Sequence, residues 1–205
     1  ESFENAVKNS EFVILCTPVD TIIPILKSIS PYLTPNTIVT DVGSVKESIC
    51  SQANAITKDA SFKFIGSHPM AGSEKSGMKY ASVELLKRAT CIITPNQCTD
   101  AFALEKVTQF WSQLEMNPVY MSPENHDSLI AKISHLPHII ASVLAASLSN
   151  VPENQFLFAG GGLKDTTRVA GGSPTLWQSI ISQNSEDILK SIDQFEKTLN
   201  TFKNS

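Results

Sequence analysis

The sequence predicts a doubly wound α/β domain followed by an all-helical domain. Through the first part of the chain, short continuous apolar runs alternate with helical patterns, which is typical of a parallel sheet covered on both faces. The strand-like runs stop at Ser122-Pro123. From there to the end, apolar residues recur at helical spacing. We therefore expect two domains, residues 1–122 and residues 123–205.

In the first domain, each expected strand is a short run rich in Val, Ile, Phe or Thr, and most of these runs end next to glycine or proline. Each expected helix has apolar residues three and four positions apart. Right-handed crossovers should connect the parallel strands. In chain order we expect a strand at 12–16, a helix at 19–29, a strand at 37–42, a helix at 45–56, strands at 62–65 and 90–94, a helix at 101–114 and a short strand at 118–121.

The second domain is expected to contain only helices. Residues 124–150 predict one long helix, kinked at Pro137. Two glycine-rich segments, 160–162 and 171–174, separate two shorter helical pieces, and residues 185–202 form an amphipathic stripe. A domain this small would struggle to bury so much apolar helix surface alone. Packing against a second copy, a homodimer, is therefore expected.

Composition excludes several classes of function. Hydrophobic residues make up 41% and charged residues 18%, with a net charge of -4, so no basic footprint for nucleic acid is present. The longest apolar stretch, residues 139–148, is too short to span a membrane. The cysteines lack C-x-x-C or metal-ligand spacing, which indicates reduced thiols, a cytoplasmic location and no structural metal. They are Cys16, Cys50, Cys91 and Cys98.

His68 is the leading candidate for acid–base chemistry. It follows the expected strand at 62–65, in a segment of Gly and Ser that continues to Ser73 and Glu74. Ligands of open α/β sheets bind beyond the carboxyl ends of the strands. Histidine titrates near neutral pH and so suits a general base. A tight turn with an incidental exposed histidine is the alternative for this segment taken alone.

Ser44 follows the expected strand at 37–42 and Gly43, where a helix should begin. Its position predicts a helix N-cap. The same position places its hydroxyl at the ligand edge of the sheet, beside a cofactor or a catalytic side chain. The two roles are compatible.

The helical domain adds a third and a fourth polar cluster. His135 and His138 share a helix face, but zinc normally needs a third ligand and no H-E-x-x-H pattern is present, so we expect no metal. His138 is the better pocket candidate, whereas His126 is interpreted as a helix-start residue next to Asp127. In the fourth cluster, Arg168 stands among small residues and could bind a carboxylate bidentately, with Asp165 orienting it or simply pairing with it at the surface. Trp177 is a core residue or a pocket wall.

Four segments in this order and spacing resemble the prephenate dehydrogenase family, which includes arogenate and cyclohexadienyl dehydrogenases. The resemblance runs over nearly the whole chain. It implies that residues 1–122 are the C-terminal part of a Rossmann-like dinucleotide-binding domain, and that residues 123–205 bind substrate and dimerise. The segments are Asp41-Val42-Gly43-Ser44-Val45-Lys46, Gly66-Ser67-His68-Pro69-Met70-Ala71-Gly72, Ser134-His135-Leu136-Pro137-His138 and Asp165-Thr166-Thr167-Arg168-Val169-Ala170.

The resemblance implies oxidative decarboxylation of prephenate to 4-hydroxyphenylpyruvate with NAD, or NADP, in tyrosine biosynthesis. His68 would be the base, and Ser44 would bridge it to the substrate hydroxyl and the nicotinamide. Arg168 and His138 would hold the substrate carboxylates, with Asp165 orienting Arg168. Arogenate is the alternative substrate, although His138 and the Glu74 loop look more like the prephenate-using members. The remaining matches are Glu74 and Trp177 near the pocket mouth, Ser73 in the same loop, Thr17 and Pro18 at the cofactor, and His135 in a structural role.

One family feature is missing from this sequence. The family begins with a strand and a G-x-G-x-x-G turn that holds the cofactor pyrophosphate, and none of the 9 glycines here forms that pattern. We therefore expect a truncated chain that binds dinucleotide poorly, with an exposed edge strand at 12–16.

Three other functions remain open at this stage. A non-catalytic scaffold fragment is favoured by the missing glycine turn. A metal hydrolase would use His126, His135 and His138, and it predicts zinc in the purified protein. Another hydroxyacid dehydrogenase would carry a catalytic lysine in the helical domain, and no residue here argues for that role.

Overall fold

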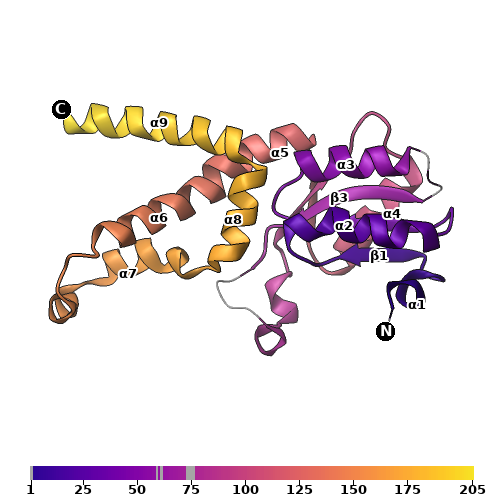
Figure 1. Cartoon of the computed structure of the whole chain (residues 1–205), viewed down its shortest axis with the longest axis horizontal. Coiled ribbons are helices and arrows are strands. Elements are labelled where there is room, and N and C mark those ends of the chain that lie inside the picture. The colour runs from indigo at the N-terminus through magenta and orange to yellow at the C-terminus, as the bar shows by residue number, and fades with distance from the viewer. Residues whose placement is uncertain (1, 59, 61, 73–76) are drawn as a thin grey trace. The chain divides into compact units, whose positions relative to one another are not determined.

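The computed structural model describes residues 2–58, 60, 62–72 and 77–205. The chain forms two compact units, which Figure 1 colours from indigo to yellow along the sequence. Of the described residues, those up to 127 form the first unit and residues 128–205 form the second. The division falls inside a helical stretch that begins at Pro123.

The first unit is built on a five-stranded sheet in the order β1-β2-β3-β4-β5. The pairs β1–β2, β2–β3 and β4–β5 are parallel, whereas β3–β4 is antiparallel. The doubly wound α/β class is confirmed, but the prediction of a wholly parallel sheet was wrong at that pair. The strands are β1 (Phe12–Leu15), β2 (Ile38–Asp41), β3 (Lys63–Pro69), β4 (Thr90–Thr94) and β5 (Asn117–Tyr120).

The reversal at β4 follows from the connection that leads to it. A parallel neighbour needs a crossover of a dozen or more residues, usually an α-helix. Between β3 and β4, the described residues form only two short 3₁₀ turns, η2 (Met78–Tyr80) and η3 (Val83–Leu85). Strand β4 therefore lies beside β3 in the opposite direction. Paired with β4, strand β3 extends to Pro69, four residues beyond the predicted end at residue 65.

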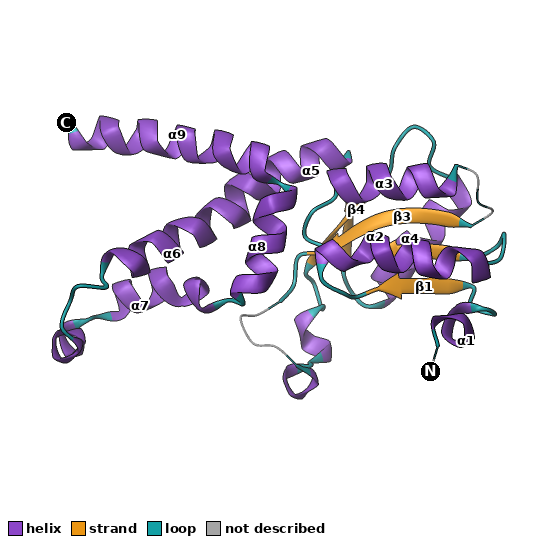
Figure 2. Cartoon of the chain, viewed as in Figure 1, coloured by secondary structure: helices purple, strands orange, loops and turns teal. Residues whose placement is uncertain are grey.

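Helices cover both faces of the sheet. Figure 2 shows α2 (Val19–Ile29) and α3 (Glu47–Thr57) in front of the strands and α4 (Ala101–Gln113) behind them. On α4, Ala103, Val107 and Trp111 pack against the buried sheet residues Ile65 and Ile93. On α2, the fully buried residues recur three and four positions apart, which is the expected core stripe. They are Ile22, Leu26 and Ile29.

Strand β1 is an edge strand of the described sheet, as predicted, because it pairs only with β2. Its residues are mostly half-buried, and Cys16, just beyond its end, is exposed rather than packed inside a strand. A short helix, α1 (Phe3–Val7), precedes it and was not predicted from the sequence.

The second unit is helical, as predicted. The long helix from Pro123 changes register before Pro137: α5 (Pro123–Ile130) passes into a π-helical turn, η4 (Ala131–His135), and then into α6 (Leu136–Ser147). Proline has no N–H and its ring crowds the carbonyl four residues earlier, so the wider turn before it takes the place of a simple kink. The remaining elements are η5 (Glu153–Phe158), α7 (Gly161–Thr167), η6 (Arg168–Gly171), α8 (Pro174–Gln183) and α9 (Ser185–Lys203).

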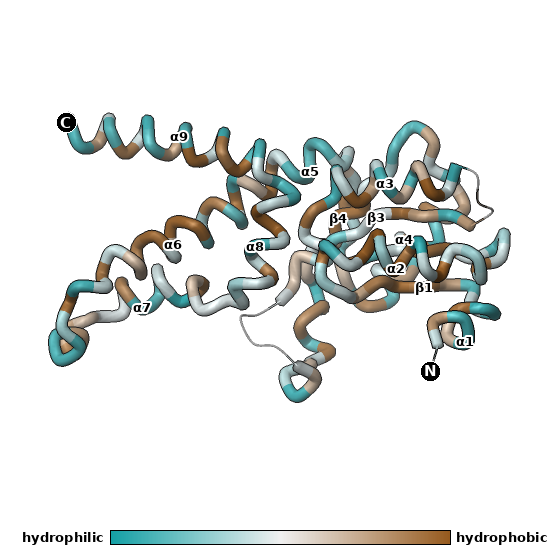
Figure 3. The backbone as a smooth tube through the Cα atoms, in the orientation of Figure 1, coloured by the Kyte–Doolittle hydropathy of each residue, from teal (hydrophilic) through white to brown (hydrophobic). Residues whose placement is uncertain are grey.

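By length and composition alone, the stretch Pro123–Ser147 is apolar enough to cross a membrane. A core helix of a soluble protein passes the same test. Only 28% of its most apolar window is buried inside this chain, and Figure 3 shows hydrophobic residues along α6. Much of this apolar surface is therefore unpartnered within the chain.

Candidate functional site

A buried ion pair joins the end of β2 to the start of α3. Asp41 and Lys46 are both 0% exposed, and the Lys46 ammonium contacts Asp41 Oδ2. The Asp41 carboxylate also accepts the backbone N–H of Gly43 at 2.9 Å and that of Ser67 at 3.2 Å. At Gly43, a Cβ atom would lie 2.8 Å from Asp41 Oδ2, so only glycine fits there. This cluster fixes the turn after β2 against β3.

Ser44 lies in that turn and is half-buried, but the prediction that it caps the helix was wrong. Helix α3 begins at Glu47, and its N-cap residue, Lys46, makes no side-chain cap. The Asp127 carboxylate, from a distant part of the sequence, caps the helix instead. It accepts the backbone N–H of Lys46 at 2.8 Å and that of Glu47 at 2.9 Å. The positive end of the helix dipole also stabilises a carboxylate at this position.

His68 lies within β3, opposite Ile92 of β4, and not in the loop after the strand as predicted. It is 8% exposed. Its Nδ1 atom lies 2.8 Å from Nε2 of His126, and Nδ1 of His126 lies 2.6 Å from Oδ1 of Asp127. A chain of hydrogen bonds therefore runs from β3 through His126 to Asp127 and on to the first turn of α3. All of these residues belong to the first unit.

From the sequence, His126 was interpreted as a helix-start residue or, in the metal-hydrolase alternative, as a zinc ligand, so this chain of hydrogen bonds was missed. His126 is 0% exposed. Burial lowers the pKa of its ring and outweighs the neighbouring Asp127, which raises it. The imidazole is therefore neutral near pH 7. The sequence feature that could have revealed this role is the adjacent His126-Asp127 pair, which precedes an apolar helical stretch. Titratable residues that are buried need partners, so such a pair indicates a hydrogen-bonded site.

Thr17 and Pro18 follow β1, at the same carboxyl edge of the sheet as Ser44. Within the described part of the chain, the Thr17 hydroxyl is buried without a hydrogen-bond partner. Buried polar atoms are almost always paired, so this hydroxyl is an exception at the edge of the sheet where ligands of such folds bind. Pro18 precedes α2 as its N-cap residue and makes no side-chain cap.

In the second unit, His138 and Trp177 form a parallel stack, with ring centroids 3.5 Å apart and an interplanar angle of 9°. His138 is 7% exposed, and burial lowers its pKa despite a hydrogen bond to the backbone of Val169. Among the described residues its Nδ1 atom has no hydrogen-bond partner. Gly172 faces the stack so closely that a Cβ would lie 2.7 Å from Trp177 Nε1. The stack therefore presents a buried, unpaired nitrogen beside a rigid indole.

The remaining residues predicted for the substrate site do not belong to this stack. Asp165 lies in α7 and Arg168 opens η6, and both are exposed. His135 is buried, with Nδ1 3.2 Å from Asn184 Nδ2, and its ring meets Trp177 edge-on. Ser73 and Glu74 fall outside the described residues. Over the residues that the structure describes, no group of three or more His, Cys, Asp or Glu side chains could hold a metal ion.

Comparison with known proteins places both parts of the chain in one family. Residues 1–120 match the nucleotide-binding domain of prephenate dehydrogenase, and residues 122–205 match its dimerization domain. Among curated relatives, the chain is 36% identical to prephenate dehydrogenase of Bacillus subtilis over 95% of its length, and 31% identical to cyclohexadienyl dehydrogenase of Zymomonas mobilis, also over 95%. It covers 53% of the first relative and 67% of the second.

Solved structures agree. Prephenate dehydrogenase from Aquifex aeolicus, in complex with hydroxyphenyl propionate and NAD+, matches with a TM-score of 0.91 at 36% identity, covering 99% of this chain and 71% of that one. Synechocystis arogenate dehydrogenase matches with a TM-score of 0.80 at 31% identity, over 98% and 72% of the two chains. The chain spans about half the length of the Bacillus relative. Matched in both of its parts, it belongs to the prephenate dehydrogenase family.

Proposed function

We propose that this chain carries the catalytic residues of a prephenate dehydrogenase, which converts prephenate to 4-hydroxyphenylpyruvate with NAD, a step of tyrosine biosynthesis. The observation that carries the proposal is the buried His68, held by His126 and Asp127 near the carboxyl edge of the sheet, in a member of this family. Residues 1–122 would provide the cofactor side and residues 123–205 the substrate and dimer side.

The chemistry needs a base and a hydride acceptor. Bound NAD supplies the acceptor for the hydride from the ring carbon that carries the hydroxyl. His68 takes the hydroxyl proton, so the carbon–oxygen bond becomes a carbonyl. The bond to the ring carboxylate then breaks, carbon dioxide leaves, and its electron pair restores the aromatic ring as the carbonyl oxygen regains a proton. Because a protonated imidazole cannot accept the hydroxyl proton, activity should fall as His68 becomes charged.

The Thr17 hydroxyl supports a bound cofactor, because it is a buried polar atom whose pairing within the described chain is incomplete. Together with Pro18 and Ser44, it lies where dinucleotides bind in such sheets. These residues fit one part of NAD. In this fold a G-x-G-x-x-G turn holds the pyrophosphate, and the given sequence contains no such pattern.

His138 and Arg168 are proposed to bind the two carboxylates of the substrate, with Asp165 orienting the guanidinium. Trp177 would form a wall against the ring, with Glu74 and Ser73 contributing from the preceding loop. The buried, unpartnered Nδ1 of His138 supports a polar ligand at that point. If Arg168 binds a carboxylate, Arg168→Ala should raise KM for prephenate, because the loss of one partner of a charge pair costs about 2–4 kcal/mol, or roughly 30- to 800-fold.

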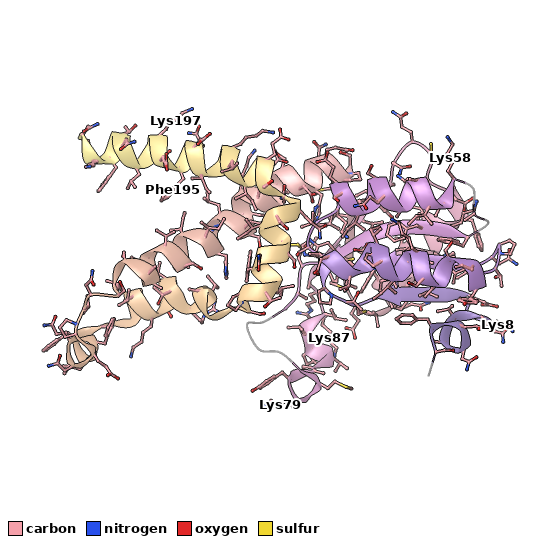
Figure 4. All side chains as sticks on the ribbon, in the orientation of Figure 1. Lys8, Lys58, Lys79, Lys87, Phe195 and Lys197 are labelled. Carbon is pink, nitrogen blue, oxygen red and sulfur yellow. The ribbon has the colours of Figure 1, made fainter. Side chains whose placement is uncertain are left out.

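We also propose a homodimer formed through the helical unit. Large apolar side chains of η4, α6 and α9 are exposed. Phe195 of α9 (Figure 4) and Leu136 line an apolar groove of about 350 Å³. Such patches mark interfaces. The residues are Ile133, Val143, Leu189, Leu199 and Phe202. Four free cysteines are consistent with a cytoplasmic protein.

The test measures NADH formation with prephenate and with arogenate, using the longest natural polypeptide that contains this sequence. Turnover of prephenate in preference to arogenate is expected. His68→Asn should lower kcat by about 10²–10⁴-fold. The asparagine amide can replace Nδ1 as the donor to His126, so the fold should be kept while the base is lost. Failure to turn over either substrate, with NAD binding intact, would refute the proposal.

A further inference from the structure

We propose that His126 and Asp127 act as positioning residues that fix the tautomer of His68, so that Nδ1 carries the proton and Nε2 is the proton acceptor. The assignment of a base role to His68 rests on the proposed function. The tautomer itself rests only on the hydrogen bonds of the first unit, so the two can be tested apart.

His126 and Asp127 share a short hydrogen bond between Nδ1 and Oδ1. An ionised carboxylate only accepts hydrogen bonds, so the contact of 2.6 Å requires a proton on Nδ1 of His126. The carboxylate cannot turn away easily, because its two oxygens also accept the backbone N–H groups of Lys46 and Glu47. The first turn of α3 therefore holds Asp127 in place.

The charge of His126 is set by its burial and by the charged groups around it. Among the described residues, the charged or titratable groups that act on it are Asp127 on its own helix, Lys46 and Asp41 from the turn after β2, and His68 from β3. The carboxylates favour an imidazolium and Lys46 opposes it, while burial opposes it most strongly. With 0% exposure, His126 is neutral, and its second nitrogen, Nε2, has a lone pair and no proton.

His126 Nε2 lies 2.8 Å from His68 Nδ1. Since Nε2 of His126 can only accept, Nδ1 of His68 must donate. A neutral His68 then carries no proton on Nε2, where its ring lone pair lies. If His126 were instead an imidazolium, its Nε2–H would donate to His68, and the neutral His68 would carry its proton on Nε2, where it could not act as a base. The structure thus distinguishes a productive arrangement from a blocked one.

The test uses nitrogen-15 NMR of the 205-residue chain with labelled histidine, which reports the protonation of each ring nitrogen. His68→Asn assigns the His68 signals. In the unsubstituted chain at pH 7.5, His68 should be protonated at Nδ1 and His126 also at Nδ1. His68 protonated mainly at Nε2, or a charged His126, would overturn the proposal.

Two variants at position 126 separate tautomer control from folding. His126→Phe removes the acceptor, and His68 should shift toward protonation at Nε2. His126→Gln places an amide oxygen near the former Nε2 and should keep the Nδ1–H form. His135→Gln, a buried histidine of the neighbouring turn, is the matched control and should leave the His68 spectrum unchanged. If His68 keeps one tautomer in all three variants, His126 does not set it.

Activity of the longer polypeptide supplies the second readout. His126→Phe should lower kcat by roughly 10²-fold, the lower end of what a general base contributes, with little change in KM for prephenate. His126→Gln should recover most of that loss. Equal rates for both variants, or a loss expressed only in KM, would refute the positioning role. An inactive unsubstituted enzyme with the predicted tautomer would refute the proposed function and leave the tautomer assignment standing.

Discussion

Replacing Gly172 with alanine should disrupt the stacked pair of His138 and Trp177. The backbone at Gly172 has φ -64° and ψ 161°, which alanine adopts without strain, so the effect comes from space alone. The new Cβ would lie 2.7 Å from Trp177 Nε1, 3.1 Å from Trp177 Cδ1 and 3.4 Å from His138 Cε1. Carbon atoms prefer separations of about 3.5–4.0 Å. The indole must therefore leave its place against the imidazole, or the η6–α8 turn must move.

Overpacking of this kind typically costs about 1–3 kcal/mol. For a chain of this length, that corresponds to a fall in Tm of about 2–12 °C. Gly171→Ala is the matched control, since a Cβ at Gly171 meets nothing within 4 Å. The assay compares thermal unfolding and near-ultraviolet circular dichroism, which reports the tryptophan environment. If the two variants share the same Tm and the same aromatic spectrum, the packing argument is refuted.

Two further predictions concern the buried ion pair of the first unit and two buried histidines, one in each unit. Lys46→Met should reduce the free energy of unfolding by about 3–5 kcal/mol, because it leaves Asp41 charged and buried, and the double variant with Asp41→Asn should recover part of the loss in urea unfolding. Burial lowers the pKa of His126 and His138, so below about pH 6.5 these rings bind protons in the unfolded chain but not in the folded chain. As the pH is lowered below that value, the free energy of unfolding should therefore decrease by up to about 1.4 kcal/mol per pH unit for each ring. The slope should be shallower in His126→Gln, and equal slopes would contradict the assignment.

Local patterns predicted most elements of the fold. The helix at 19–29 was predicted at its observed bounds, and β4 also matches. Both segments have strong apolar patterns with clear stop signals at their ends. The direction of β4 was not predictable in this way, since strand direction depends on the connection. The residues between β3 and β4 contain glycines and short polar runs that do not reveal whether a crossover helix is present.

Two residues of the candidate site, His68 and Ser44, were proposed from the sequence because each follows a recognisable strand. The error at Ser44 shows the limit of a local capping rule. Ser44 has the right chemistry for an N-cap, but the N–H of Glu47 is instead accepted by the carboxylate of Asp127, 80 residues further along the chain. Tertiary caps of this kind leave no signal in the helix itself.

The same limit explains why His126 was missed, and it also suggests how such residues can be found. Taken alone, a histidine followed by an aspartate at a helix start is typical of an exposed first turn. In the structure, both side chains are buried, with His126 0% and Asp127 1% exposed, and buried titratable pairs need partners. The first strand-end histidine in the chain supplies one partner, and the unsatisfied N–H groups of α3 supply the others. An ionisable pair leading into an apolar helix is therefore a reason to look for a partner at the carboxyl edge of the preceding sheet.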